Sequence, residues 1–349
     1  MSKKLKIGIV GLGNIADIHA QAIKEAYNTE LISAYSSSGE KAASFAEKYG
    51  IAGFSNWDKF ISDANLEAVS ICTPNGTHLD FGEKAAKAGK HVIVEKPIEV
   101  TLERARKLID VCRENNVRLA VIYQTRFMDK IRELKHFLDQ GSLGKLFMGD
   151  AYVKWYRSQE YYDSGAWRGT IALDGGGVLI NQAIHTVDLL QWLMGDVDTV
   201  FGQSGTFTHR LEGEDNAVAA LHFKNGAIGV IEASTSVQPA QARKLEIHGE
   251  KGTIVIEDDE VKILLEGENS EDINDSEVEK KESAGASSPL GGFSITPHKN
   301  QFEAIADAIE KNETPLVSGE ESLKSLAIVL AVYESARTGK NVKFDDFIK

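Results

Sequence analysis

Short apolar runs alternate with longer amphipathic segments through the first third of the chain. A short apolar run predicts a buried strand, and apolar residues at helical spacing predict a helix. The predicted strands are Leu5 to Val10, Leu31 to Tyr35, Val69 to Cys72, His91 to Val94 and Leu119 to Tyr123, and the predicted helices are Ala16 to Ala26, Glu40 to Tyr49, His78 to Ala88 and Leu102 to Asn115. Such alternation is typical of right-handed βαβ units, so residues 1–124 are expected to form a doubly wound α/β domain on a parallel sheet.

The pattern changes after Arg126. Segments rich in β-branched and aromatic residues are now separated by turn signals such as Lys224-Asn225-Gly226, which favours antiparallel pairing. The predicted strands are Phe147 to Tyr156, Val200 to Phe207, Ala217 to Phe223, Ala227 to Ser236, Lys244 to His248 and Thr253 to Ile256, and the predicted helices are Met128 to Gln140, Gly177 to Met194, Lys299 to Lys311 and Ser322 to Thr338. Residues 125–349 are therefore expected to form an α+β domain on a mostly antiparallel sheet, with the final helices packing here or back on the first domain.

Length and charge narrow the class of protein. The chain has 349 residues, which is enough for two domains. A formal net charge of −13 argues against binding to nucleic acid or to an anionic membrane, and no apolar stretch is long enough to span a bilayer. Cys72 and Cys112 show neither disulfide nor metal spacing, and the N-terminus lacks a signal sequence, so we expect a cytoplasmic protein. The acidic, serine-rich stretch from Glu266 to Ser288 predicts a solvated loop.

A glycine turn stands between the first predicted strand and the first predicted helix. Its sequence, Gly11-Leu12-Gly13-Asn14-Ile15-Ala16, has the spacing G-x-G-x-x-[G/A]. The first glycine permits a tight turn, the second lets the backbone approach a pyrophosphate, and the small third residue lets the helix pack on the strand. We therefore expect a dinucleotide-binding Rossmann domain, with Gly11, Gly13, Asn14 and Ile15 at the cofactor.

The end of the second strand bears on the choice between NAD and NADP. An Asp or Glu usually stands there and binds the adenosine ribose. This chain has Ser36-Ser37-Ser38-Gly39-Glu40-Lys41 instead. Without a carboxylate at the strand end, the 2′-phosphate of NADP would meet no repulsion. Ser36, Ser37 and Lys41 could donate hydrogen bonds to this phosphate, although the segment from Ser36 to Lys41 contains no arginine. The cofactor is expected to be NAD or NADP, with a slight preference for NADP.

Further polar residues follow the later strands of the same predicted sheet. Cys72-Thr73-Pro74-Asn75 leads to His78, Glu95-Lys96-Pro97 follows His91 to Val94, and Gln124 follows the strand that ends at Tyr123. Pro97 lacks an amide hydrogen, so the strand must stop there. Lys96 is thereby placed at the carboxyl edge of the sheet, where open α/β sheets bind their ligands. By position alone, Lys96 is either a surface lysine or a ligand-binding one.

The predicted helix Gly177 to Met194 carries a second set of polar residues. Asn181, His185 and Asp188 fall on one face at helical spacing, after a run of glycines. A histidine in such a helix is either a buried core residue or an acid–base group. We expect no metal site, since no second histidine lies nearby, and no serine hydrolase, since no G-x-S-x-G motif occurs. Upstream, Trp167-Arg168 forms either a packed loop or a segment that closes over the cofactor or substrate.

Together these motifs resemble the Gfo/Idh/MocA family, which includes glucose–fructose oxidoreductase and inositol dehydrogenase. The resemblance covers nearly the whole chain and rests on the glycine turn, the Thr73-to-His78 segment, Glu95-Lys96-Pro97, and the glycine-rich approach to His185. It implies a nicotinamide cofactor in the first domain, a carbohydrate-like substrate over the open-faced sheet of the second, and homodimers or homotetramers built through that sheet.

The resemblance also implies roles for individual residues. Lys96 would hydrogen-bond the reacting hydroxyl and His185 would exchange its proton, while Asn181 stands where many members have Asp and cannot take a proton. Such an Asn, with Trp167-Arg168-Gly169 upstream, resembles the branch that oxidises UDP-N-acetylglucosaminuronate at C3. A non-redox member, either an NAD-dependent glycosidase or a sensor, is the alternative. The residues expected at the cofactor under this resemblance are Thr73, Pro74, Asn75, His78, Glu95, Lys96, Gln124, Trp167 and Arg168.

Overall fold

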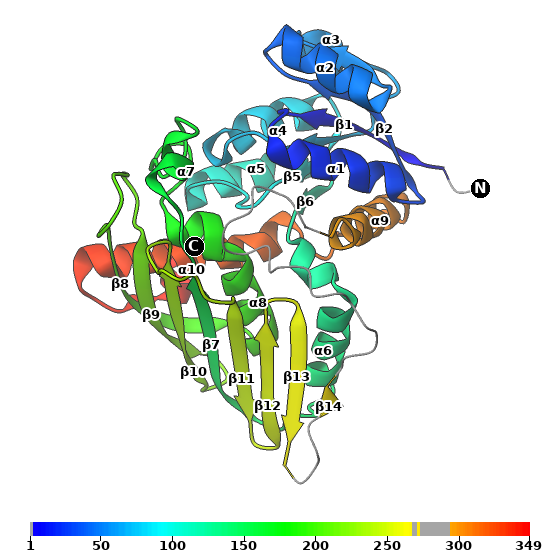
Figure 1. Ribbon diagram of the computed structural model, residues 1–349. Helices are drawn as coiled ribbons and strands as arrows, with labels where there is room; N and C mark the ends of the chain where they lie inside the picture. Colours follow the sequence, from blue (N-terminus) through cyan, green and yellow to red (C-terminus); the bar gives the residue numbers. More distant parts are fainter. Residues whose placement is uncertain (1–2, 267–270, 273–293) are drawn as a thin grey trace. The chain divides into compact units, whose positions relative to one another are not determined.

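The computed structural model describes residues 3–266, 271–272 and 294–349 (Figure 1). The chain divides into two compact units. Unit 1 comprises Met1–Phe127 and Ser294–Leu323, and unit 2 comprises Met128–Phe293 and Lys324–Lys349. The acidic stretch from Glu266 to Ser288 lies outside the described residues except for Glu266 and a two-residue strand, β14 (Glu271–Asp272).

Unit 1 is built on a six-stranded parallel sheet in the order β3-β2-β1-β4-β5-β6. Its strands are β1 (Leu5–Val10), β2 (Thr29–Tyr35), β3 (Ala52–Phe54), β4 (Ala68–Ile71), β5 (His91–Val94) and β6 (Leu119–Val121). Its helices are α1 (Asn14–Glu25), α2 (Gly39–Tyr49), α3 (Trp57–Ile61), η1 (Asn75–Thr77), α4 (His78–Lys87), α5 (Leu102–Glu114), η2 (Gln124–Phe127) and α9 (Thr296–Glu310). The predicted doubly wound fold is confirmed. β3 and α3 were not predicted, because three to five residues are too few to show a period.

The strand order of unit 1 reverses beside β1. β1 pairs with β2 on one side and with β4 on the other, and all of these strands are parallel. Ile7 and Ile9 are fully buried, because helices cover both faces of a parallel sheet. A crevice for ligands is expected at the carboxyl ends of strands next to such a reversal. The glycine turn, Thr73 and Lys96 follow the neighbouring strands β1, β4 and β5 at this edge.

Unit 2 is built on a nine-stranded sheet in the order β14-β13-β12-β11-β7-β10-β9-β8-β15. Apart from β14, its strands are β7 (Leu146–Lys154), β8 (Val197–Gly205), β9 (Asn216–Phe223), β10 (Ile228–Ser234), β11 (Lys244–Gly249), β12 (Gly252–Glu257), β13 (Glu260–Leu265) and β15 (Val342–Lys343). Among the described strands of this second sheet, only β7 and β10 pair in parallel, so the predicted mostly antiparallel sheet is confirmed. β13 was missed by the sequence analysis.

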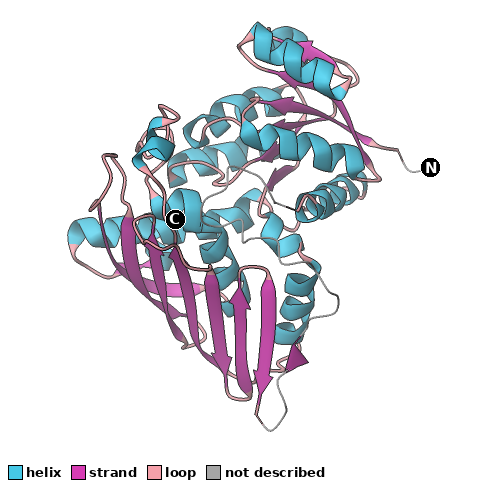
Figure 2. Ribbon diagram, in the orientation of Figure 1, coloured by secondary structure: helices cyan, strands magenta, loops and turns pink. Residues whose placement is uncertain are grey.

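Helices cover one face of this second sheet (Figure 2). The helices on this face are α8 (Ile184–Met194) and the unit 2 part of α10 (Gly319–Thr338), and unit 2 also contains α6 (Asp129–Asp139), α7 (Gln159–Asp163) and α11 (Phe344–Phe347). α8 contacts β7 and β11, and Ser335 of α10 accepts a hydrogen bond from the amide of Gly202 in β8. On the other face, apolar side chains such as Phe201 and Val218 are exposed.

The predicted single helix from Gly177 to Met194 differs from the structure at its start. Leu179–Ala183 form a π-helical turn, η3, and regular α-helix begins only at Ile184. A π-turn accommodates one extra residue and often marks a functional segment. No helix within the described ranges is both long and apolar enough to cross a membrane.

Candidate active site

The glycine turn of unit 1 shows why its small residues are needed. Gly11 has φ +87°, and a Cβ atom there would stand 2.6 Å from Cγ2 of Thr73. At Gly13, by contrast, a Cβ would meet no protein atom within 4 Å. Ala16 is fully buried where α1 packs on the sheet. Gly11 is therefore required by the protein itself, whereas the space at Gly13 is open to a ligand at the N-terminus of α1.

The segment after β2 is held by its own backbone contacts. The amide of Ser38 donates to Oγ of Ser36 at 3.2 Å, and Ser38 caps α2 by accepting from the amide of Lys41 at 3.3 Å. Ser37 and Lys41 are exposed. No carboxylate stands between Tyr35 and the start of α2. The segment therefore presents hydroxyl and ammonium groups, as the sequence analysis expected.

His78 ties two strand ends together. Its Nδ1 lies 2.9 Å from the carbonyl oxygen of Pro97, and its Nε2 lies 3.0 Å from the carbonyl oxygen of Thr73. The ring is completely buried, as is most of Asn75. The peptide bond between Lys96 and Pro97 is cis. His78 thus holds the loops after β4 and β5, which is a structural contribution to the site rather than an exposed ligand-binding group.

Lys96 is half-buried, whereas Glu95 before it is buried and bonded inside unit 1. Oε1 of Glu95 lies 2.7 Å from Nε2 of His19, and Oε2 accepts from the amide of Lys96 at 3.1 Å. Glu95 was predicted to be a cofactor-binding residue, whereas no role was predicted for His19. The remaining candidate of this unit, Gln124, is half-buried in η2 directly after β6.

In unit 2, Trp167 and Arg168 belong to an aromatic and cationic cluster. The guanidinium of Arg168 lies 4.4 Å from the ring centroid of Tyr161 and 4.8 Å from that of Trp167, and its Nη1 donates to the Tyr161 hydroxyl at 2.8 Å. Arg157 stacks on the same Tyr161 ring at 5.1 Å. Such cation–π contacts orient the guanidinium groups. Tyr161 and Arg157 were not singled out in the sequence.

Asn181 is oriented by a carboxylate seven residues earlier. Its Nδ2 donates to Oδ1 of Asp174 at 2.6 Å, and Oδ2 of Asp174 accepts from the amide of Gly169 at 2.7 Å. Asp174 is buried, and Asn181 and His185 are half-buried. Asp188 does not share their environment, because it is buried and accepts a hydrogen bond from Ser325 of α10 at 2.6 Å. Asn181, His185 and Asp188 were predicted to lie on one face of the helix. In the structure Asn181 and His185 are partly exposed, whereas Asp188 is buried.

The run of glycines before η3 makes room for Glu214. A Cβ at Gly177 would lie 1.7 Å from the carbonyl oxygen of Glu214. The Glu214 carboxylate accepts from the amides of Gly177 at 2.9 Å and Leu179 at 2.8 Å, and from the hydroxyl of Tyr333 at 3.0 Å. Burial raises the pKa of Glu214 to about 7, against the effect of these donors. Glu214 thus satisfies the first amides of the helix that carries His185.

Each unit offers one half of the chemistry expected of a dehydrogenase. Unit 1 has an open glycine turn for a dinucleotide and a lysine at the same sheet edge. Unit 2 has an imidazole and an oriented amide on one helical segment. Oxidation of a secondary alcohol requires a hydride acceptor and a group that takes the hydroxyl proton.

Two sets of three side chains in the described part of the chain have the composition of metal ligands. One set is His19, Glu95 and His298, and the other is Asp150, Glu246 and His248.

Comparison with known proteins agrees with this arrangement. Residues 5–123 match the model of an oxidoreductase family described as an NAD-binding Rossmann fold, and residues 135–344 match the C-terminal alpha/beta domain of the same family, Gfo/Idh/MocA. The chain is 25% identical to myo-inositol 2-dehydrogenase of Thermotoga maritima over 99% of its length and 100% of the relative. It is 26% identical to scyllo-inositol 2-dehydrogenase (NAD(+)) of Bacillus subtilis, with 99% and 98% covered.

Among solved structures, the chain resembles the WlbA dehydrogenase of Bordetella pertussis in complex with NADH and UDP-GlcNAcA. The TM-score is 0.85 at 31% sequence identity, and 98% of this chain and 99% of the other are covered. The family matches span both units, and this relative matches almost the whole chain. The protein is therefore an oxidoreductase that belongs to the Gfo/Idh/MocA family and has that family's NAD-binding Rossmann domain.

Proposed function

We propose that this protein is an NAD(P)-dependent dehydrogenase that transfers hydride between the nicotinamide ring and a secondary alcohol of a sugar, sugar derivative or inositol. The observation that carries the proposal is the placement of Lys96. It follows β5 at the same sheet edge as the glycine turn that follows β1, with only β4 between the two strands. A cation at this edge stands where a bound nicotinamide cofactor and its substrate are expected.

The roles of the site residues follow from the charge that develops during the reaction. The Lys96 ammonium hydrogen-bonds the reacting hydroxyl and stabilises the developing alkoxide. His185 takes the proton as the hydride leaves the carbon, since an imidazole can gain and lose a proton near neutral pH. Asn181 cannot accept a proton, so we assign it a hydrogen bond to the substrate. The bound cofactor supplies the hydride acceptor, held by Gly11, Gly13, Asn14 and Ile15.

The test of this function combines cofactor binding with a substrate screen. Wild-type protein should bind NAD(H) or NADP(H) in a fluorescence titration, and one of a set of sugars, inositols and UDP-sugars should change the absorbance of the reduced nicotinamide. Lys96→Ala should lower kcat by about a thousandfold with cofactor affinity unchanged. Lys87→Ala, at an exposed lysine of α4, is the matched control. If the protein bound neither NAD(H) nor NADP(H), the proposal would be wrong. Product formation without a net change in NAD(P)H would favour a glycosidase.

A second candidate is narrower: a dehydrogenase acting at C3 of UDP-N-acetylglucosaminuronate. It is supported by the 31% identical neighbour, whose complex holds NADH and UDP-GlcNAcA, and by Asn181 with Trp167 and Arg168 upstream. The guanidinium groups of Arg157 and Arg168 on one tyrosine suit an anionic substrate. If this candidate is right, UDP-N-acetylglucosaminuronate should have a kcat/KM at least a hundredfold above that of uncharged sugars.

For the cofactor we propose a slight preference for NADP. The segment after β2 carries Ser36, Ser37 and Lys41 and no carboxylate that would repel a 2′-phosphate. NADPH should therefore bind more tightly than NADH in parallel titrations. Lys41→Glu should reverse the order, and tighter binding of NADH by wild type would refute the preference.

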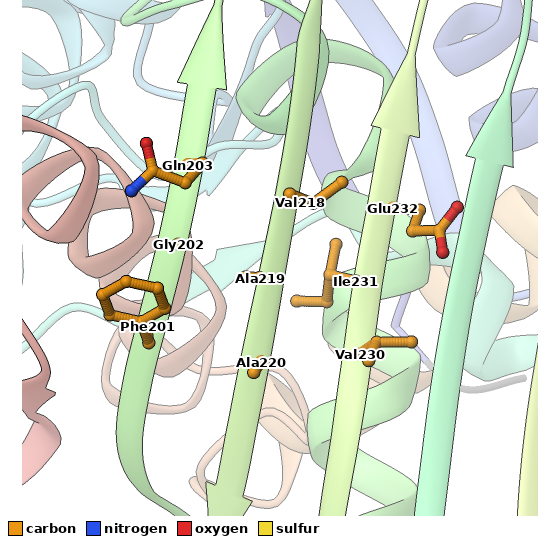
Figure 3. A pocket seen from close by; sticks show the side chains of 9 residues that line it. All are labelled: Phe201, Gly202, Gln203, Val218, Ala219, Ala220, Val230, Ile231 and Glu232. Atoms are coloured by element: carbon orange, nitrogen blue, oxygen red, sulfur yellow. The ribbon is translucent and has the colours of Figure 1, made fainter. Parts of the chain in front are cut away.

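We further propose that the protein works in the cytoplasm as a homodimer or homotetramer assembled through the open face of the second sheet. A shallow hollow lies on this face across β8, β9 and β10, lined by Phe201, Gly202, Gln203, Val218, Ala219, Ala220, Val230, Ile231 and Glu232 (Figure 3). Phe201 is 40% exposed and Val218 53% exposed. Contiguous exposed apolar side chains of this kind mark association surfaces.

A further inference from the structure

A buried polar cluster lies inside unit 1, directly behind the peptide that leads into Lys96. Its centre is His19 of α1, which has no exposed surface. Nδ1 of His19 lies 2.8 Å from Oγ of Ser70 in β4, and Nε2 lies 2.7 Å from Oε1 of Glu95 at the end of β5. His298 of α9 is also buried, with its ring 5.8 Å from that of His19.

The geometry accommodates an ion pair between His19 and Glu95. Nε2 of His19 faces the Glu95 carboxylate, and Nδ1 faces Oγ of Ser70 and, at 3.3 Å, Sγ of Cys72, so an imidazolium can donate from both ring nitrogens here. Burial opposes the charge, but Cys72 and Glu95 together raise the pKa of His19. Burial likewise opposes ionisation of Glu95, but the hydrogen bond from His19 lowers its pKa. The pKa of His19 is raised and that of Glu95 is lowered, which is the pattern of two groups that each stabilise the charge of the other.

A metal ion is a poorer description of the same residues. His19, Glu95 and His298 could each offer one ligand atom within 4.8 Å of the others. Two ligands of one tetrahedral zinc ion stand roughly 3.3 Å apart, given metal–ligand bonds of about 2.0 Å. The distance from Nε2 of His19 to Oε1 of Glu95 is 2.7 Å, which is instead the length of a charge-assisted hydrogen bond. Burial, followed by the proximity of His19, lowers the pKa of His298 to about 4, so its ring is neutral.

The pair connects three parts of the cofactor-binding edge. His19 stands on the helix that begins at the glycine turn, and Ser70 belongs to β4, two residues before the Cys72-Thr73 strand end. Glu95 uses its second oxygen to accept from the backbone amide of Lys96 at 3.1 Å. The position of the Lys96 backbone is therefore coupled, through one carboxylate, to the helix that holds the dinucleotide.

We propose that His19, in its imidazolium form, is a positioning residue for Lys96 that acts through Glu95. It fixes the Glu95 carboxylate so that this group orients the Lys96 amide, and it neutralises a negative charge that would otherwise stand beside the Lys96 ammonium. The inference rests on the proposed function in that Lys96 acts on the substrate hydroxyl. It adds to that function a residue which touches neither cofactor nor substrate.

The groups that face this pair define its dependence on pH. Ser70 comes from β4, Cys72 directly follows that strand, Lys96 follows Glu95, and His298 comes from α9. Phe302 of α9 closes the remaining side with an edge contact at 5.3 Å. His19 and Lys96 are thus the two cations beside Glu95, and His298 adds none. Loss of the His19 charge leaves an uncompensated carboxylate next to Lys96, which holds the Lys96 proton more tightly.

The first measurement concerns the wild-type protein and does not depend on its activity. In ¹⁵N-edited NMR of the histidine rings, His19 should keep the signature of an imidazolium from pH 6 to above pH 8, whereas an ordinary histidine loses its proton near pH 6.5. The resonance is assigned by its loss in His19→Gln or, if that variant does not fold, by selective loss of its shift in Glu95→Gln. Deprotonation of His19 near pH 6.5 would overturn the inference.

The second measurement compares turnover across pH. His19→Gln should lower kcat by about tenfold to a hundredfold, with KM and the Kd of the reduced cofactor within about twofold of wild type. The alkaline limb of its pH profile should move to higher pH. His298→Gln, at the buried histidine that does not bond Glu95, is the matched control and should keep the wild-type profile.

The outcomes separate the two proposals. If Lys96→Ala is inactive while His19→Gln keeps the wild-type kcat and pH profile, the positioning role is wrong and the dehydrogenase function stands. If His19→Gln and His298→Gln lose the same activity with no change of profile, the effect is general damage to the core and the inference again fails. If wild type neither binds nor turns over any nicotinamide cofactor, the proposed function fails, and the NMR titration still decides the charge of His19.

Discussion

At the scale of the residue, a side chain at Gly13 would be compatible with the protein fold but not with a ligand bound against the backbone. No protein atom lies within 4 Å of a Cβ built there, and the backbone has φ −87°, which any residue can adopt. Gly11, at φ +87° and close to Thr73, is constrained by the fold itself. A substitution at Gly13 is therefore felt only by a molecule that approaches the backbone.

Gly13→Val should fold like wild type but bind the cofactor poorly. The added side chain occupies the space in which the pyrophosphate would approach the N-terminus of α1. We expect a melting temperature within about 2 °C of wild type and a Kd for the reduced cofactor raised at least tenfold, or about 1.4 kcal/mol. Differential scanning fluorimetry and fluorescence titration measure the two quantities. Unchanged affinity would show that the cofactor does not approach this turn.

Asn181 shows how a single neighbour decides the chemistry of a position. Its amide donates to Asp174, which in turn orients Gly169. Many relatives are expected to carry Asp at this position, so Asn181→Asp looks conservative. In this chain it would set two carboxylates 2.6 Å apart, if the side chains kept their places.

Asn181→Asp should lower activity rather than restore an acid–base group. Two carboxylates at this distance cannot both ionise, so one holds a proton and the pKa of the pair is raised. We expect kcat to fall by at least tenfold at pH 7 and to recover in part at lower pH. Asn341→Asp, at an exposed position of unit 2, controls for the added charge. Equal or higher turnover by Asn181→Asp at pH 7 would contradict this account.

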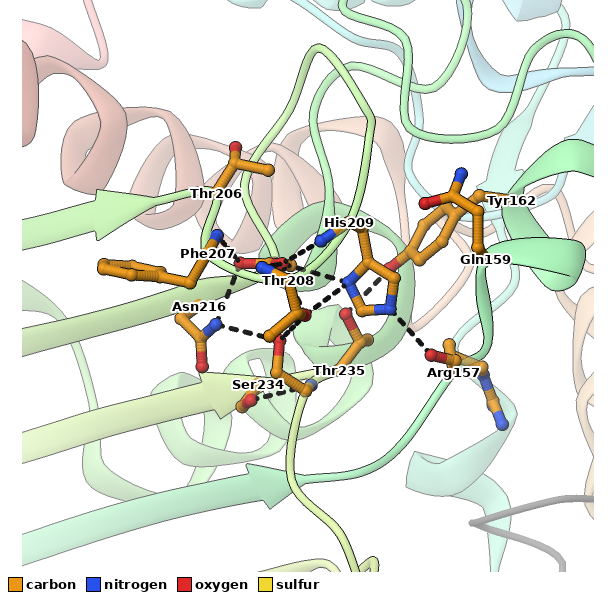
Figure 4. Close-up of polar contacts among 12 residues, drawn as sticks. Arg157, Gln159, Tyr162, Thr206, Phe207, Thr208, His209, Asn216, Ser234 and Thr235 are labelled. Carbon is orange, nitrogen blue, oxygen red and sulfur yellow. Dashed lines mark hydrogen bonds and ion pairs between the residues drawn. The ribbon is translucent and has the colours of Figure 1, made fainter.

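At the scale of the element, the loop between β8 and β9 is held by one carboxylate (Figure 4). Asp215 has no exposed surface and accepts hydrogen bonds from the amides of Phe207, Thr208 and His209. It also lies 3.0 Å from Nδ1 of His209, whose Nε2 lies 2.7 Å from the carbonyl oxygen of Arg157. Through His209 the loop is therefore tied to the segment that carries the Arg157 and Tyr161 cluster.

The same carboxylate predicts how unit 2 responds to acid. Although burial opposes ionisation, the donated backbone hydrogen bonds lower the pKa of Asp215 below its ordinary value of 3.8. A lowered folded-state pKa means that the stabilisation is present above pH 3.8 and is lost as the pH falls below it. Asp215→Asn should reduce the free energy of unfolding at pH 7 by about 2–4 kcal/mol. The reason is that the Asn side chain has one acceptor oxygen, whereas the Asp215 carboxylate accepts hydrogen bonds at two oxygens.

Urea unfolding at pH 7 and pH 3 measures this effect. The difference between wild type and Asp215→Asn should shrink at pH 3, because the carboxylate of the unfolded chain is then largely protonated while that of the folded protein is still ionised. Asp198→Asn, at a carboxylate of β8 that is 39% exposed and lies 3.4 Å from Nδ1 of His222, is the control and should change stability by less than about 0.5 kcal/mol. A constant difference at both pH values would show that Asp215 acts by packing alone.

At the scale of the whole molecule, the open face of the second sheet carries exposed apolar side chains. Phe201 of β8, Val218 of β9 and Ile228 of β10 are exposed on neighbouring strands. Val218→Glu should place a charge in the middle of this surface. If the protein associates through the sheet, the variant should sediment at a lower mass than wild type.

Analytical ultracentrifugation tests this expectation, with circular dichroism to confirm an intact fold. Leu316→Glu is the matched control, since Leu316 is 52% exposed but belongs to unit 1. It should keep the wild-type mass. Equal masses for wild type and Val218→Glu would move the association surface elsewhere or leave the protein a monomer.

Much of the fold and part of the site were predictable from the sequence because their signals are local. Strand and helix periods predicted both sheets, and the glycine turn and Lys96 were found because each motif directly follows an apolar run. Short elements such as β3 and α3 lack a readable period. The π-turn before α8 was missed because it preserves the apolar pattern of a helix.

Local patterns along the chain were enough to predict the classes of the two sheets, the dinucleotide turn and the lysine at the sheet edge. The pairing of buried polar groups became visible in three dimensions: His19 pairs with Glu95, 76 residues away, and Glu214 with the amides of Gly177 and Leu179, 37 and 35 residues away. Local motifs carry their conformational requirements within a few residues. A buried polar group, however, must find its partner wherever the fold brings one, and no spacing along the chain records that choice.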